Sequence, residues 1–324
     1  MDRGGSVVTA STVRDADTPH LRRVGSSDVF VPPIALGGAV FGWTLARAGC
    51  VDVLERFLDC GGGLIDTASS YASGMSEHTI GSWIRERGAR DRILIATKVG
   101  RHADAPGLSA KSIRQGVDAS LQRLQTDVID LLYFHAEDPS VPIEESLAAV
   151  AELVDAGKVR AVGASNFSVS GLRAARIAAS SGLPRIDAVA WEYSLLRRDI
   201  VEGDGAALLA DHESSLMPYF ALAHGFLGVH RSIKPDPAVQ DTRLRRAAAH
   251  ANRHSLSVLK VLDDIALTHE TDVSAVALAW ALSRPQVAAA AVGVESTEQL
   301  DGVMAALALN LTHHELSELD RVSA

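Results

Sequence analysis

The chain alternates between short runs of consecutive apolar residues and longer stretches in which apolar residues recur three and four positions apart. The short runs lack the polar–apolar alternation of a half-exposed strand, so they are typical of strands buried on both faces of a parallel sheet. A hairpin is expected at residues 21–32. The eight buried strands expected after it are 34–36, 64–66, 93–98, 128–135, 159–164, 188–191, 216–220 and 287–292.

The stretches between these runs have the spacing of amphipathic helices that bury one face. Residues 109–125 and 143–155 show this spacing clearly, and Gly157 supplies the glycine that commonly follows the end of a helix. The most apolar stretch, residues 273–282, is too short to span a membrane and is followed by Arg284 and Pro285. We expect it to be a buried helix.

Eight strand–helix units in succession predict either a closed barrel or an open, doubly wound sheet. An open dinucleotide-binding sheet carries the motif GxGxxG after its first strand, and the sequence LGGAVFG at residues 36–42 lacks that spacing. We therefore predict an α/β fold, a (β/α)8 TIM barrel whose bottom is capped by the N-terminal hairpin. Residues 20–324 are expected to form this single domain, and residues 1–19 a flexible tail.

The composition argues against several classes of protein. Against 40 Asp and Glu residues there are 31 Lys and Arg, a net charge of −9, which disfavours general binding to nucleic acid or to an anionic membrane. The N-terminal residues lack the apolar core of a signal peptide. The two cysteines, Cys50 and Cys60, are too few for a disulfide framework or a structural zinc site, and no metal site is expected. A cytoplasmic location is the expectation.

Polar or ionisable side chains end five of the predicted strands in succession. In strand order they are Asp66, Lys98, His135, the pair Ser165 and Asn166, and the pair Glu192 and Tyr193. Taken singly, each residue has an ordinary structural explanation, such as a helix cap, a solvated surface group or core packing. Catalytic residues of (β/α)8 barrels lie at the C-terminal ends of the strands and on the loops that follow. The joint pattern therefore favours an active site.

The motifs that contain these residues occur in a fixed order along the chain. They read LIDTASSY (64–71) with GMSE (74–77), ATKVG (96–100), DLLYFHAED (130–138), VGASNF (162–167), EYSLL (192–196), YFALAHGFL (219–227) and GVESTEQ (293–299). As a set, these segments resemble the aldo/keto reductases, and the resemblance extends from about residue 21 to the end of the chain. It implies a nicotinamide-dependent oxidoreductase.

The resemblance implies a catalytic tetrad of Asp66, Tyr71, Lys98 and His135, and the chemistry of these side chains agrees with it. Carbonyl reduction needs a proton donor at the oxygen while hydride reaches the carbon. The phenol of free tyrosine, with a pKa of about 10, is a weak acid unless a cation stabilises the phenolate. Lys98 can supply that charge, and Asp66 can keep Lys98 protonated and in place. His135 can hydrogen-bond the substrate oxygen.

The resemblance also implies where a nicotinamide cofactor would bind. Ser165 and Asn166 would hold its carboxamide, and Tyr193 would stack on the nicotinamide ring. Segment 220–225 would lie against the pyrophosphate and segment 293–299 around the adenosine. The implied cofactor residues are Gly37, Gly38, Asp66, Ser165, Asn166, Tyr193, Phe220, Ala221, Leu222, Gly225, Gly293, Glu295, Ser296 and Gln299, and Trp43 is expected to border the substrate pocket.

The chain departs from the family pattern on the cofactor side. Ala190 replaces a glutamine that is common two residues before the strand-six glutamate, and Glu295 stands where many relatives carry a basic or small residue. The cationic segment 231–253, with Ser296 and Gln299, would surround a 2′-phosphate with donors. Because several arginines should outweigh one carboxylate, the sequence favours NADP(H) over NAD(H). The long polar segment 228–254 is expected to form a lid over the cofactor phosphates.

These expectations describe an NAD(P)(H)-dependent oxidoreductase that transfers a hydride between nicotinamide and a carbonyl or alcohol. Its partner is expected to be a small molecule, for example a sugar or deoxysugar ketone or aldehyde, rather than a nucleic acid or a membrane. The alternative is a regulatory subunit that binds the cofactor as a redox sensor with little turnover. Pocket loops vary independently of the barrel, so the sequence leaves the substrate and the oligomeric state open.

Overall fold

The computed structural model describes residues 21–228 and 242–324. The predicted tail at 1–19 lies outside these ranges, as does the segment 229–241 of the predicted lid. The strands are β1 (Arg22–Arg23), β2 (Phe30–Val31), β3 (Ile34–Gly37), β4 (Leu64–Asp66), β5 (Leu94–Val99), β6 (Arg101–His102), β7 (Ala105–Pro106), β8 (Ile129–Phe134), β9 (Val159–Ser165), β10 (Ala188–Ala190), β11 (Ser215–Leu216) and β12 (Ala290–Val292). The α-helices are α1 (Arg47–Asp59), α2 (Met75–Arg87), α3 (Ala110–Leu124), α4 (Ile143–Asp155), α5 (Val169–Ala179), α6 (Ala206–His212), α7 (Thr242–Ala249), α8 (Arg253–Thr268), α9 (Val273–Leu282), α10 (Thr297–Met304) and α11 (His313–Val322).

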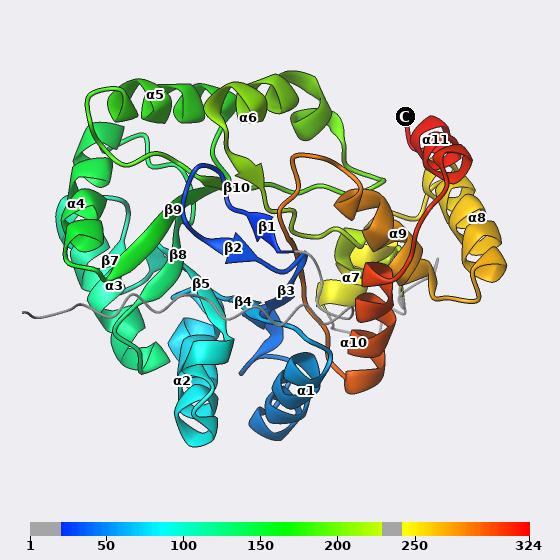
Figure 1. The fold of residues 1–324 in the computed structure, drawn as a ribbon, viewed down its shortest axis with the longest axis horizontal. Coiled ribbons are helices and arrows are strands. Elements are labelled where there is room, and N and C mark those ends of the chain that lie inside the picture. Colours follow the sequence, from blue (N-terminus) through cyan, green and yellow to red (C-terminus); the bar gives the residue numbers. More distant parts are fainter. Residues whose placement is uncertain (1–20, 229–241) are drawn as a thin grey trace, which may run out of the picture.

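Eight strands form one sheet in the order β11-β10-β9-β8-β5-β4-β3-β12, with every neighbouring pair parallel. The two ends of this sheet meet. The amide of Ala288 donates to the carbonyl of Leu216 at 3.0 Å, and that of Ala291 to the carbonyl of Pro218 at 2.8 Å. The sheet therefore closes on itself with the helices around it, and the predicted (β/α)8 barrel is confirmed (Figure 1).

The apolar core forms two layers because successive side chains of a strand point to opposite faces. Large apolar residues fill the layer between the strands and the helices. The barrel interior is lined mostly by small residues, among them several alanines, with Tyr133 as its largest member. Gly163 makes room for this ring, since a Cβ atom there would lie 2.4 Å from the Cδ1 atom of Tyr133. The Tyr133 hydroxyl is buried and finds no hydrogen-bond partner among the described residues.

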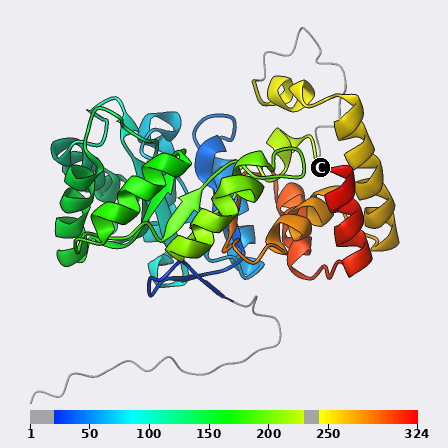
Figure 2. The same ribbon diagram turned by 90° about the horizontal axis from the view of Figure 1, so that it is seen from above.

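The N-terminal hairpin closes the bottom of the barrel, as the sequence predicts. β1 pairs antiparallel with β2, and Val24, Val29 and Val31 are buried in the same apolar cluster as the barrel interior. The Arg22 guanidinium donates to the carbonyl oxygens of residues 282 and 287 at 3.0 and 2.9 Å. Figure 2 shows the hairpin on the side of the barrel opposite α7.

The predicted helices 143–155 and 273–282 coincide with α4 and α9, whereas the seventh predicted strand is shorter than expected. Only residues 215–216 are regular strand in β11. Pro218 has no N–H to donate, and Phe220 has a φ of 51°, so the chain leaves the extended conformation before residue 220. No helix within the two described ranges is both long and apolar enough to cross a membrane.

Candidate active site

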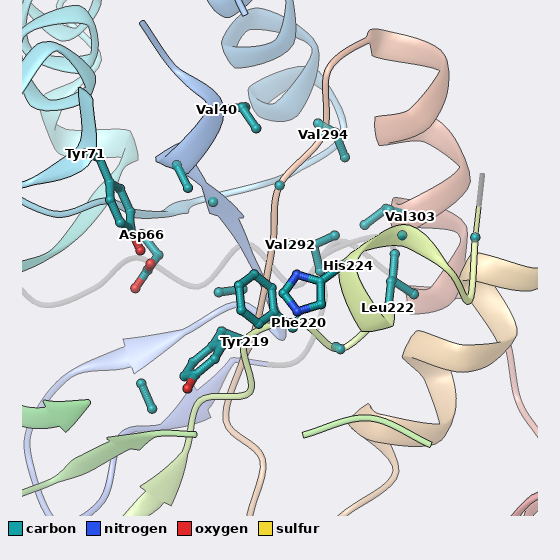
Figure 3. A pocket seen from close by; sticks show the side chains of 18 of the residues that line it. Val40, Asp66, Tyr71, Tyr219, Phe220, Leu222, His224, Val292, Val294 and Val303 are labelled. Atoms are coloured by element: carbon teal, nitrogen blue, oxygen red, sulfur yellow. The ribbon is translucent and has the colours of Figure 1, made fainter. Parts of the chain in front are cut away.

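A cavity of about 1030 Å³ opens at the C-terminal ends of the barrel strands. Its volume is at the upper end of the usual range for small-molecule sites, about 300–1,000 Å³. Figure 3 shows Asp66 and Tyr71 in one part of it and Phe220, Leu222 and His224 in another. The predicted residues that line it are Gly37, Trp43, Asp66, Tyr71, Lys98, His135, Ser165, Asn166, Phe220, Ala221, Leu222, Gly225, Gly293 and Gln299.

A buried ion pair joins the ends of β4 and β5 beside this cavity. The Nζ atom of Lys98 donates to Oδ1 of Asp66 at 2.5 Å and to the carbonyl oxygen of Thr67 at 2.9 Å. Burial alone would lower the pKa of Lys98, but the Asp66 carboxylate and the neighbouring Tyr71 hydroxyl outweigh it and raise this pKa above its ordinary value. Lys98 therefore keeps its positive charge at neutral pH where water has little access.

Tyr71 begins a short turn, Tyr71–Gly74, directly after β4. The two residues that follow it have left-handed backbone, with φ of 46° and 54°, and such strained conformations cluster at functional sites. The Nζ atom of Lys98 lies 5.3 Å from the centroid of the Tyr71 ring. The His135 ring meets the Tyr71 ring edge-on, with the centroids 5.9 Å apart. The structure thus brings the four predicted tetrad residues, Asp66 included, together.

His135 follows β8 and is neutral at physiological pH. Its pKa is lowered from 6.5 to about 3, mainly by burial and further by the positive charges of Lys98 and Arg101. Its Nδ1 atom lies 3.4 Å from the hydroxyl oxygen of Ser70. A neutral imidazole has one N–H donor and one acceptor nitrogen, so His135 can donate a hydrogen bond into the cavity without carrying charge.

A second polar group forms where β9 ends. Asn166 has a φ of 56°, a left-handed conformation that asparagine tolerates better than most residues. Its side-chain amide donates to the His135 carbonyl and to the Ser165 hydroxyl, both at 2.9 Å. Its Oδ1 atom accepts a hydrogen bond from the Tyr219 hydroxyl at 2.7 Å. The predicted pair Ser165 and Asn166 is therefore fixed next to the tetrad.

The structure does not place Tyr193 in the cavity. Tyr193 is 1% exposed, its ring stacks on Trp280, and its hydroxyl donates to Glu202 at 2.6 Å. The reason is the alternation of strand residues: Ala188 and Ala190 of β10 face the barrel interior, so odd-numbered positions face outward. Tyr219 lines the cavity instead.

Three other predicted cofactor residues lie next to the cavity but do not line it. Gly38 is buried, and its carbonyl oxygen accepts a hydrogen bond from the Ser76 hydroxyl at 2.8 Å. Ser296 caps the N-terminus of α10. Glu295 accepts a hydrogen bond from the Thr44 hydroxyl at 2.5 Å, which ties the first loop of the barrel to the last.

Sequence reasoning missed several residues that line the cavity. Arg101 lies just beyond the end of β5, and Arg246 comes from α7. Asp272 and Glu298 bring negative charge from the N-terminal ends of α9 and α10. Tyr219 is the next-to-last residue of the predicted strand 216–220, so the strand-end pattern that singled out Asp66, Lys98 and His135 could have found it. The others come from loops and helix ends, whose position the apolar pattern does not define.

Segment 220–225, which was expected at the pyrophosphate, faces the cavity in a strained loop. Phe220, Ala223 and His224 have φ angles of 51°, 46° and 58°, and Gly225 also has a positive φ. The Phe220 and His224 rings pack with their centroids 3.8 Å apart (Figure 3). Within residues 21–228 and 242–324, no three His, Cys, Asp or Glu side chains gather as a metal site.

Comparison with known proteins agrees with this geometry. Residues 33–324 match the model of the aldo/keto reductase family. The chain is 30% identical over 315 residues to norsolorinic acid reductase B of Aspergillus parasiticus, which covers 91% of this chain and 81% of the relative. It is 30% identical over 308 residues to the aldo-keto reductase YhdN of Bacillus subtilis (89% and 87%) and 29% identical over 319 residues to an aryl-alcohol dehydrogenase of Pestalotiopsis microspora (93% and 81%).

The family model covers nearly the whole barrel, and the relatives are similar to this chain along most of their own length. The chain thus combines a closed parallel barrel, with the predicted tetrad side chains at the C-terminal ends of its strands, and a family match over residues 33–324. The chain belongs to the aldo/keto reductase family, whose members are NAD(P)-dependent oxidoreductases.

Proposed function

We propose that this protein reduces the carbonyl group of a small molecule, or oxidises the corresponding alcohol, with Tyr71 as the proton donor or acceptor. The observation that carries this proposal is the buried ion pair of Lys98 and Asp66 beside Tyr71, at the edge of a cavity that also contains neutral His135. Relatives named as reductases and as an alcohol dehydrogenase support this reaction class.

The cavity fits a nicotinamide dinucleotide together with a substrate. Gly37 and Gly293 lie side by side in its wall, and a Cβ atom on Gly37 would lie 3.2 Å from the Gly293 amide nitrogen, so glycine at residue 37 lets the two backbone segments pack closely there. Ser165 and Asn166 offer hydrogen-bonding groups at one end, and Gln299 offers an amide at the other. When bound, this cofactor supplies or accepts the hydride.

Proton transfer is the step that the residues of this chain perform. Negative charge develops on the carbonyl oxygen as the hydride reaches the carbon, and Tyr71 neutralises it by giving up its proton. The ammonium group of Lys98 stabilises the phenolate that remains, because electrostatic attraction is strong where water is excluded. Asp66 holds Lys98 protonated and in place, and the turn after β4 fixes the position of Tyr71.

His135 orients the substrate without competing for the proton. Because its imidazole is neutral, it can donate one hydrogen bond to the carbonyl oxygen. If the Ser70 hydroxyl donates to Nδ1 of His135, the N–H at Nε2 is the group left for the substrate. The pair of donors, Tyr71 and His135, then defines where the carbonyl oxygen lies.

The cofactor preference that we propose is NADP(H) over NAD(H). Arg246 lines the cavity on the side away from the tetrad, and a guanidinium pairs well with a phosphate. Asp272 and Glu298 line that side too, and they weaken the preference by repulsion. A sugar or deoxysugar carbonyl stays a candidate substrate, and polar Ser70 beside the tetrad supports it.

The test is Tyr71→Phe, assayed with a panel of aldehydes and NADPH. We expect a loss of roughly 10²–10⁴-fold in kcat, because the variant has no proton to give. The Kd of NADPH, measured by fluorescence titration, should stay unchanged because the ring remains.

Tyr133→Phe is the matched control, since its ring centroid lies 5.5 Å from the same Lys98 Nζ but its hydroxyl is buried in the barrel interior. We expect this variant to keep its activity. Near-normal turnover by Tyr71→Phe would remove Tyr71 from the mechanism. Tight NADPH binding without turnover of any carbonyl compound by the wild type would favour a cofactor-binding sensor instead.

A further inference from the structure

Arg101 brings a positive charge to the part of the cavity that contains the tetrad. Its side chain lines the cavity together with Ser70, Tyr71 and His135. Its charge is one of the causes, after burial and Lys98, that lower the pKa of His135, so the guanidinium lies within electrostatic range of the imidazole. Within the described residues, neither an ion pair nor a side-chain hydrogen bond engages it, in contrast to Lys98, which is paired with Asp66.

The backbone of Arg101 is held in a defined position. Gly100, with a φ of 102°, turns the chain after β5, and its carbonyl accepts a hydrogen bond from the Gly107 amide at 2.9 Å. β6 and β7 then form a short antiparallel hairpin with Arg101 opposite Pro106. The Leu108 amide that follows donates to a carboxylate oxygen of Asp138 at 2.9 Å. A small hairpin tied to the barrel rim therefore presents the guanidinium.

Of the acidic side chains that line the cavity, Asp66 is the one on the same side of the barrel as Arg101. Asp66 is compensated by Lys98. The other acidic side chains that line the cavity, Asp272 and Glu298, come from α9 and α10, on the opposite side of the barrel from the β6–β7 hairpin (Figure 1). Among the side chains that line this end of the cavity, the charge of Arg101 is therefore not neutralised by an acidic partner.

We propose that Arg101 binds an anionic group of the substrate, so that the preferred substrates are carbonyl compounds that carry a carboxylate or a phosphate ester. The inference rests on the proposed function, because the tetrad defines where the reacting carbonyl lies. A guanidinium pairs bidentately with either anion. The contact forms in the ground state and in the transition state alike, so its loss raises KM more than it lowers kcat.

The experiment compares two matched pairs of aldehydes: 4-carboxybenzaldehyde with methyl 4-formylbenzoate, and glyceraldehyde 3-phosphate with glyceraldehyde. kcat and KM are measured with NADPH for the wild type, for Arg101→Gln and for Arg92→Gln. Arg92 is a matched control because it is an exposed arginine at the opposite end of β5. The two pairs also show which anion, carboxylate or phosphate, the site takes.

We expect the wild type to favour the anionic member of at least one pair by roughly 10- to 100-fold in kcat/KM, the strength of a charge-assisted contact. Arg101→Gln should lose this preference through a KM that rises more for the anionic member of the pair than for the neutral member, and Arg92→Gln should keep the preference. Equal use of both members by the wild type, or a preference that survives in Arg101→Gln, would overturn the inference but not the proposed function. No reduction of any of the four aldehydes would overturn the inference, and no reduction of any member of the aldehyde panel used for Tyr71→Phe would refute the proposed function as well.

Discussion

Replacing His135 by glutamine should make the protein less sensitive to acid. The pKa of His135 is lowered from 6.5 to about 3, first by burial and then by the charges of Lys98 and Arg101. The unfolded chain therefore binds this proton more readily than the folded one, and stability is lost as the pH falls from about 6.5 towards 3. At about 1.36 kcal/mol per pH unit, the histidine lowers the free energy of unfolding by about 2 kcal/mol between pH 7.5 and pH 5.

The assay is urea-induced unfolding at pH 7.5, 6 and 5, followed by tryptophan fluorescence. Glutamine keeps a polar side chain at residue 135 but does not titrate. Between pH 7.5 and pH 5 the free energy of unfolding of the variant should therefore fall by about 2 kcal/mol less than that of the wild type. His78→Gln serves as the control, because His78 is exposed on α2 and its replacement should leave the wild-type pH dependence in place. Parallel pH dependence of wild type and His135→Gln would refute the neutral, buried imidazole on which the proposed mechanism relies.

Three further predictions concern other charged and polar groups of the site. Lys98→Met should lower kcat by roughly 10²–10⁴-fold and move the alkaline limb of the pH–rate profile upward, because the Tyr71 phenolate loses its counter-charge; an unmoved profile with a normal rate would make Lys98 structural. Tyr133→Phe should raise the free energy of unfolding by about 1–3 kcal/mol, because it removes a buried hydroxyl without a partner among the described residues. A lower free energy of unfolding for this variant, measured by urea unfolding, would contradict the prediction. Arg246→Ala should raise the Kd of NADPH by about 10-fold and leave that of NADH unchanged in fluorescence titrations; equal effects on both would show that Arg246 does not contact the 2′-phosphate.

The barrel and the strand-end positions of Asp66, Lys98 and His135 were predictable because they depend on local pattern, whereas Tyr71 was implied by the resemblance to the aldo/keto reductases. Continuous apolar runs indicate buried parallel strands, and parallel strands align their C-terminal ends at one side of the sheet. Polar residues at the ends of three neighbouring runs, such as Asp66, Lys98 and His135, therefore had to converge. The hairpin at 21–32 was also expected, and its valines complete the barrel interior.

The other cavity residues could not be predicted from apolar runs, because their positions depend on side-chain direction within a strand and on the conformation of loops. Tyr193 and Tyr219 both lie at the ends of apolar runs. Whether each ring reaches the cavity or the core depends on which residues of its strand point into the barrel, and the apolar run alone does not show this. Arg101 reaches the cavity because Gly100 turns the chain, and that turn depends on contacts with residues 107 and 108. The lid predicted from residues 228–254 stays a prediction over 229–241, which lie outside the described residues.

The closure of the barrel has a consequence for how the protein is made. Ile34 of β3 pairs with Ala290 of β12, the last strand of the described chain. Gly37 and Gly293, at the C-terminal ends of these two strands, line the cavity. During synthesis on the ribosome, β3 can pair with β4 early but with β12 only after residues 290–292 have emerged. The tetrad comes from the first half of the chain, but the wall opposite it does not exist on a nascent fragment. A dinucleotide bound in the cavity that we propose for it would therefore be held only by chains in which β3 and β12 have already paired, and its binding would stabilise that pairing.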